Sequence, residues 1–140
     1  EYRSRGTATD MAASVTFLIT DASGTSPLKT QDILRPGDRL GVRYGNPTSH
    51  KTLTVLGYDG TRIHWVYPGQ AGEAAVAIQS GKDAINVRLP EDVVFAPGEI
   101  QGSELKLVAA FDVAPERLAA QIRAQDVTGA TQLSLRWQEK

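Results

Sequence analysis

The chain has 140 residues, with 15 lysines and arginines against 16 aspartates and glutamates, and it has no cysteine. A chain of this length normally forms one domain. Its formal charge of -1 argues against a nucleic-acid partner, which needs a basic surface to replace phosphate counterions. The lack of cysteine excludes disulfides, thiolate zinc sites and iron–sulfur clusters, and no apolar run approaches the roughly 18 residues of a membrane span.

The chain starts at Glu1 without an initiator methionine, and Arg3 and Arg5 give it a short basic beginning. We therefore expect residues 1–11 to be an N-terminal extension, either a solvated terminus or a juxtamembrane segment that follows a membrane helix before Glu1. Residues 12–140 are expected to form a single domain, because they contain no internal repeat, low-complexity segment or linker.

Apolar and polar residues alternate along five segments, which we predict to be strands with one buried face. These segments are residues 14–20, 39–44, 62–67, 84–89 and 131–137. In the third segment, Trp65 and Tyr67 fall on one face and His64 on the other. In the fourth segment, Ile85 and Leu89 are expected on the buried face.

Two further segments, residues 51–58 and 105–111, carry apolar residues on both faces. This pattern predicts central strands that are covered on both sides by other layers. Residues 74–78 and 93–95 are weaker strand candidates.

Turn residues separate these strands. Residues 35–38 predict a type II turn in which Gly37 takes a positive φ and the side chain of Asp38 bonds to the backbone. Asp59 and Gly60 form the residue pair preferred in a two-residue type I′ hairpin. Short strands at regular spacing indicate an antiparallel sandwich or barrel, and we predict a mainly β fold, an antiparallel β-sandwich of about eight or nine strands.

One helix is expected over residues 114–125. Pro115 suits the first helical turn, where its missing N–H is not needed, and Asp112 is placed to cap from just upstream. Leu118 and Ile122 lie at helical spacing on one side. We expect this helix to pack across a sheet edge or a barrel end, with a partner-binding helix as the alternative.

The sequence holds no complete catalytic motif. The two histidines, His50 and His64, do not belong to a two-histidine ligand motif. We expect His50 to be solvated in a loop, and His64 to face solvent or a second layer. No calcium loop is present either, so we predict no metal site and no cofactor.

The aromatic residues allow two interpretations. Tyr58, Trp65, Tyr67 and Trp137 would form a platform for a sugar or peptide if they were exposed together. However, Trp65, Tyr67 and Trp137 share alternating faces with aliphatic residues, which favours core packing.

The order of the motifs resembles a known bacterial module. The matching segments are residues 34–40, 53–60, 65–68, 84–89 and 104–111, which carry a Pro-Gly-Asp turn, a strand ending in Asp-Gly, a Tyr-Pro strand end and a Glu-Leu strand. Over residues 12–125 the chain is similar to the extracytoplasmic β-sandwich domain of membrane-anchored, anti-sigma-factor-like proteins, the domain of unknown function numbered 4384. This resemblance implies a bacterial periplasmic or cell-envelope location, attachment to the membrane only through an N-terminal anchor, and no catalytic residues.

We therefore predict a non-enzymatic sensory or protein-interaction module whose partner is another envelope protein or a second copy of the chain. The first alternative is a carbohydrate-binding module that uses exposed aromatics. The candidate ligand-binding residues are Tyr58, His64, Trp65 and Tyr67. A second alternative is a small enzyme in which His64 and a nearby carboxylate act as acid and base.

Overall fold

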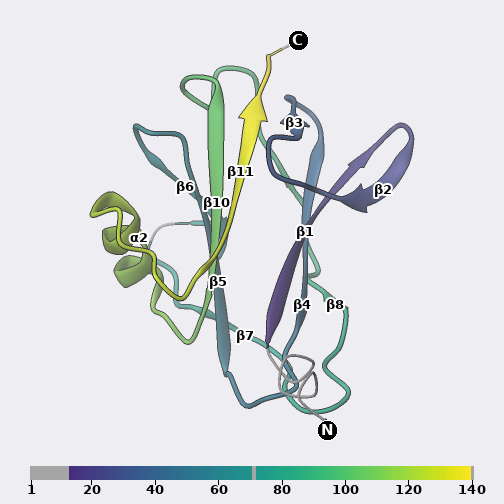
Figure 1. The fold of residues 1–140 in the computed structure, drawn as a ribbon, viewed down its shortest axis with the longest axis vertical. Helices are drawn as coiled ribbons and strands as arrows, with labels where there is room; N and C mark the ends of the chain where they lie inside the picture. The colour runs from purple at the N-terminus through teal and green to yellow at the C-terminus, as the bar shows by residue number, and fades with distance from the viewer. Residues whose placement is uncertain (1–12, 71, 140) are drawn as a thin grey trace, which may run out of the picture.

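The computed structural model describes residues 13–70 and 72–139, so the extension expected over residues 1–11 lies outside the described residues. The chain folds into three layers (Figure 1): helix α2 (Pro115–Arg123), a six-stranded sheet and a five-stranded sheet. The predicted mainly β sandwich with one helix is confirmed for this part of the chain. Eleven strands are present there, more than the eight or nine expected.

Sheet 1 is antiparallel. Its strands lie in the order β2 (Gly24–Pro27), β1 (Ser14–Asp21), β4 (Arg39–Gly45) and β8 (Val87–Arg88), and β9 (Val93–Val94) pairs with the other end of β4.

Sheet 2 is mixed. Its order is β3 (Ile33–Leu34), β11 (Thr131–Trp137), β10 (Glu104–Phe111), β5 (Thr52–Tyr58) and β6 (Ile63–Tyr67), and β7 (Val76–Ala77) pairs with the start of β5. The β3–β11 pair is parallel and all the others are antiparallel. It joins segments from nearly opposite ends of the described chain.

The main core lies between the two sheets. Its fully buried side chains include Leu53, Val55, Leu105, Leu107 and Leu135, all from sheet 2. Sheet 1 contributes buried residues such as Phe17, Leu40 and Val42. Burial of each such side chain stabilises the fold by roughly 1.5–3 kcal/mol.

A second core lies between sheet 2 and α2. Leu56 and Val108 point from the sheet into this core, and they meet Leu118 and Ile122 of the helix. Strands β5 and β10 are therefore covered on both faces, as their two-sided apolar pattern predicted. The helix runs over residues 115–123, inside the expected 114–125.

Local backbone conformation explains where the sequence pattern was misleading. Ile85 was expected on a buried face but is 61% exposed, because Asn86 has a φ of 56° that interrupts the strand and leaves β8 only two residues long. Strands β2 and β3 were not predicted, since they are short and β2 is wholly exposed. The turn at residues 35–38 is confirmed: Gly37 has a φ of 90°, and the Arg35 N–H donates to Oδ2 of Asp38 at 2.9 Å.

A bulge in β6 redirects one of the predicted aromatic residues. Leu56 lies opposite Trp65 and Val55 lies opposite Tyr67, which leaves Val66 as an extra residue. An extra residue reverses the alternation of side chains beyond it. Trp65 consequently packs against the helix-side core and Tyr67 against the core between the sheets, so the expected shared face is wrong.

Candidate functional site

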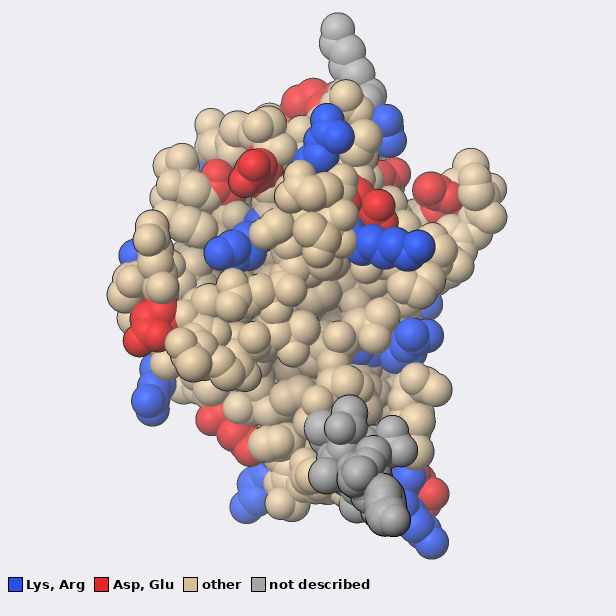
Figure 2. Space-filling view, in the orientation of Figure 1, with Lys and Arg blue, Asp and Glu red and all other residues tan. Residues whose placement is uncertain are grey.

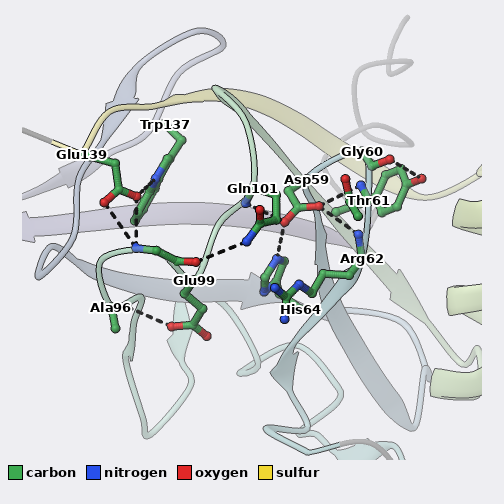
Figure 3. Close-up of polar contacts among 12 residues, drawn as sticks. Asp59, Gly60, Thr61, Arg62, His64, Ala96, Glu99, Gln101, Trp137 and Glu139 are labelled. Carbon is green, nitrogen blue, oxygen red and sulfur yellow. Dashed lines mark hydrogen bonds and ion pairs between the residues drawn. The ribbon is translucent and has the colours of Figure 1, made fainter.

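Asp59 and His64 form a buried pair at the hairpin between β5 and β6 (Figure 3). Nε2 of His64 lies 2.8 Å from Oδ2 of Asp59, and the two side chains are 5% and 0% exposed. The hairpin turn consists of Gly60 and Thr61, and only Gly60 has a positive φ. The predicted type I′ turn at Asp59 and Gly60 is therefore wrong, because Asp59 follows the last residue of β5 and stands before the two central turn residues, with its side chain accepting hydrogen bonds from the loop.

The Asp59 carboxylate also accepts three backbone hydrogen bonds (Figure 3). Oδ1 accepts from the N–H groups of Thr61 and Arg62 at 2.8 and 2.9 Å, and Oδ2 accepts from Gln101 at 2.9 Å. Burial alone would raise the pKa of Asp59, but the bonds from His64 and these N–H groups outweigh it and hold the pKa far below its usual value. The ionised carboxylate only accepts hydrogen bonds, so Nε2 of His64 carries the hydrogen.

We call Asp59, His64 and Gln101 the hairpin latch. It ties the β5–β6 hairpin to the loop that precedes β10. The ring of His64 packs edge-on against Phe95 at a centroid distance of 5.7 Å. General acid–base catalysis needs contact with the substrate proton, and both side chains of the pair are withdrawn from the surface. This geometry favours a structural role for His64.

The same loop is held a second time, through the C-terminal end of the described chain (Figure 3). Nε1 of Trp137 donates to Oε2 of Glu139 at 2.6 Å, and the Gly98 N–H donates to the same carboxylate at 3.2 and 3.3 Å. The rings of Phe95 and Trp137 meet edge to face at 6.2 Å. These contacts fix the end of the sandwich at which β6 begins.

A second histidine–aspartate pair lies at the opposite end of β5. Nδ1 of His50 is 2.8 Å from Oδ2 of Asp112, and both side chains are partly exposed. Oδ1 of Asp112 accepts from the N–H groups of Lys51 and Thr52. The hydrogen bond with His50 is the main cause that lowers the pKa of Asp112. Asp112 therefore does not cap α2, as the sequence suggested, and His50 is stacked on Phe111 instead of lying free in a loop.

The candidate aromatic residues do not form one platform. Trp65 and Tyr67 are half-buried on opposite faces of β6. Burial is the largest cause that raises the pKa of Tyr67. Tyr58 is also half-buried, but its ring borders open space on the outer face of sheet 2, and its hydroxyl donates to the Gly60 carbonyl at 3.1 Å.

That open space is a trough, and the register of the strands determines which side chains line it. Tyr58 of β5, Lys106 of β10 and Ser134 of β11 lie side by side in one row across the sheet. Helix α2 covers the neighbouring row, in which Leu56 faces Val108. Ile122 in the last turn of the helix borders the same open space as Tyr58, so the trough lies beside the part of the sheet that the helix covers.

Two cavities make up the trough, and Tyr58 and Lys106 line both of them. The larger cavity, about 460 Å³, is walled by α2 and by the polar side chains of Gln125, Thr128 and Gln132. The smaller, about 210 Å³, extends past Ser134 and Glu104. The sequence analysis missed Gln125, Gln132 and Lys106, because the register that places them beside Tyr58 is not visible in a single strand's pattern.

Gln125 has an unusual backbone conformation. It follows the end of α2 with a φ of 59°, and its N–H donates to the Ile122 carbonyl. Glycine usually occupies this position, because a side chain there costs roughly 1 kcal/mol. Strained residues cluster at functional sites, and this one lines the larger cavity.

Metal, membrane and charge features add little to this site. Within residues 13–70 and 72–139, no three histidine, aspartate or glutamate side chains are gathered as metal ligands, and no helix there is long and apolar enough to cross a bilayer. On the face seen in Figure 2, basic and acidic side chains are interspersed around an uncharged central area.

Comparison with models of protein families, with curated proteins and with solved structures finds no match to this chain.

Proposed function

We propose that this chain is a non-enzymatic binding module of the bacterial cell envelope, and that it holds an extended saccharide in the trough. The observation that carries the proposal is the trough itself, in which the Tyr58 ring lies beside amide, hydroxyl and ammonium groups. The envelope location rests on the resemblance of residues 12–125 to extracytoplasmic modules.

The chemistry of the lining suits a sugar. An aromatic ring offers a flat apolar surface with a polar tip, and it loses little conformational entropy on binding. The amides of Gln125 and Gln132 both donate and accept hydrogen bonds, as sugar hydroxyls require. The Lys106 side chain makes no hydrogen bond or ion pair within the described part of the chain and provides a charge for a carboxylated sugar.

The rigid surroundings favour binding as well. Tyr58 immediately precedes Asp59, so the hairpin latch holds the strand end that carries the ring. A preformed site avoids the cost of ordering its side chains on binding.

The test is titration of the 15N-labelled chain with hexagalacturonate, cellohexaose and chitohexaose, followed by amide chemical shifts. We expect saturable shifts around Tyr58, Lys106 and Gln132, with the acidic oligosaccharide favoured. Tyr58→Ala should weaken binding by about tenfold or more, because truncation of a central aromatic ring removes about 1.4 kcal/mol or more of binding free energy. Tyr67→Phe is the matched control, since its ring lies outside the trough and should leave binding unchanged.

Two results would contradict the proposal: no saturable shifts with any of the three oligosaccharides, or shifts that persist unchanged in Tyr58→Ala.

A second candidate, a protein partner, is favoured by the free edge of β6. This strand ends sheet 2, and its backbone bonds to no described segment other than β5. It contains no lysine, proline or acidic residue, so the bulge at Val66 is the feature of this strand that works against edge pairing. By contrast, β2 at the edge of sheet 1 is short and ends in Pro27.

An open edge of this kind can accept a strand from another protein or from a second copy of the chain. For a second copy, sedimentation velocity over a rising concentration series should show dimers, and the β6 amides should become protected from hydrogen exchange. A monomer at all concentrations would eliminate self-association through β6.

A further inference from the structure

The charged side chains along the trough differ in sign. Lys106 and Glu104 are two residues apart on β10, so both lie on the outer face of sheet 2, separated by about 7 Å along the strand. Both line the smaller cavity of the trough. Arg136 of β11 lies directly opposite Glu104 on the same face. A ligand that runs past Lys106 in this direction therefore meets a negative charge next.

These three charges have no partner within the part of the chain that the structure describes. The side chains of Lys106, Glu104 and Arg136 make no hydrogen bond or ion pair there, although Glu104 and Arg136 face each other in the strand register. All three residues are exposed. Their charged groups are therefore available to a ligand.

A third cavity, of about 370 Å³, continues from the trough beyond Glu104. Glu104 lines both this cavity and the smaller cavity of the trough. Its wall also contains the guanidinium of Arg136 and the polar side chains of Gln31, Ser103 and Gln138. One positive and one negative charge balance each other in this third cavity. By contrast, Lys106 is the only charged residue among the described residues that line the larger cavity of the trough.

We infer that the trough and the third cavity select a saccharide in which a carboxylated unit is followed by an uncharged unit. This inference rests on the proposed function and specifies its ligand. The carboxylate lies beside Lys106, where the larger cavity has a positive charge that nothing offsets. The separation of about 7 Å between Lys106 and Glu104 is comparable to the length of one sugar unit.

Glu104 provides the selectivity. A carboxylate on the next unit would lie near Glu104, and like charges brought together disfavour the wrong ligand. An uncharged unit has hydroxyl groups that both donate and accept hydrogen bonds. They can donate to the Glu104 carboxylate and accept from the Arg136 guanidinium, and hydrogen bonds to charged groups are the stronger kind.

The experiment is calorimetric titration of the chain with three hexasaccharides. In the hyaluronan hexasaccharide carboxylated and uncharged units alternate, in hexagalacturonate every unit is carboxylated, and in chitohexaose none is. We expect the hyaluronan hexasaccharide to bind most tightly. Its affinity should exceed that of hexagalacturonate by about two- to fivefold, the effect of one exposed charge interaction.

Glu104→Gln separates the charge of this residue from its size. The variant should bind hexagalacturonate about two- to fivefold more tightly than the natural chain does, because the like charge is gone. Its affinity for the hyaluronan hexasaccharide should not rise, so the preference should disappear. Glu73→Gln, the same substitution at an exposed residue that lines none of the three cavities, is the matched control and should keep the preference.

Lys106→Gln tests the other half of the inference. It should lower the affinity for both carboxylated hexasaccharides towards that of chitohexaose, because the positive charge of the larger cavity is lost.

The outcomes distinguish this inference from the proposed function. If the natural chain binds hexagalacturonate as tightly as the hyaluronan hexasaccharide, or if the preference survives in Glu104→Gln, the selection of an uncharged neighbour is overturned and saccharide binding in the trough still stands. If none of the three hexasaccharides binds, the proposed function itself is overturned.

Discussion

Replacement of Asp59 by alanine is the most direct test of the hairpin latch. The change removes a carboxylate whose side chain is fully buried and which accepts four hydrogen bonds. Loss of the hydrogen bond to His64 costs about 1.5–3 kcal/mol of unfolding free energy, because the imidazole stays buried without a partner. The three backbone donors belong to exposed residues that water can reach, so each adds only about 0.5 kcal/mol.

The expected loss in the free energy of unfolding is therefore about 3–4.5 kcal/mol. A domain with a stability of about 5–15 kcal/mol would remain folded after this loss, with a melting temperature lowered by about 10 °C. Urea unfolding followed by the fluorescence of Trp65 and Trp137 measures the change. The denaturant slope should stay constant if only the folded state is affected.

Asp83→Ala is the matched control, because Asp83 is exposed and makes no hydrogen bond within the described part of the chain. Asp59→Asn should fall between the two variants, since it keeps one carbonyl acceptor. A cost below about 1 kcal/mol for Asp59→Ala, the size of an ordinary surface change, would refute the latch as a source of stability.

Three further predictions concern acid stability and two backbone positions. The pKa values of Asp59 and Asp112 are lowered in the folded state. The stabilisation that the two ionised carboxylates provide is therefore complete above the unfolded pKa of about 4 and is lost as the pH falls below it. In urea unfolding at a series of acidic pH values, the variant with alanine at both positions should lose less stability on acidification than the natural chain. Gln125→Gly should raise the free energy of unfolding by about 0.5–1 kcal/mol, because glycine adopts the positive φ without strain. The same variant should bind the oligosaccharides more weakly in the NMR titration, and an unchanged free energy of unfolding would contradict the prediction. Gly41→Ala should displace the Arg88 guanidinium, because a Cβ atom at position 41 would lie 2.7 Å from its Nη2. The expected cost is about 0.5–1 kcal/mol, the value of the surface ion pair that Arg88 makes with Asp92, and a crystal structure with Arg88 unmoved would disprove it.

The sequence predicted the architecture well where one strand's pattern was enough. The two-sided apolar segments became β5 and β10, each covered by a layer on both faces. Pro115 and the spacing of Leu118 and Ile122 located the helix. These features depend on residues close together in the chain, so the local pattern contains the information.

The candidate site depended on pairings that local patterns do not contain. The contact between Asp59 and Gln101 joins segments far apart in sequence, and the bulge at Val66 moved Tyr67 to the other face. Lys106 reaches Tyr58 only through the register of β10 against β5. The opposition of Arg43 and Arg88 was equally hidden, since it follows from the register of β4 against β8 and not from either strand alone.

The parallel pair of β3 and β11 has a consequence for how the domain is made. Strand β11 is the last element of the described chain, and there it supplies the second neighbour of β10 and the only neighbour of β3. Until β11 has been synthesised, one edge of β10 therefore has no strand to pair with, and Leu34 cannot pair with Trp137. Such non-local pairing folds slowly and exposes aggregation-prone edges on the way. Any nascent or truncated chain that lacks β11 should be captured by chaperones or aggregate, however stable the finished sandwich is.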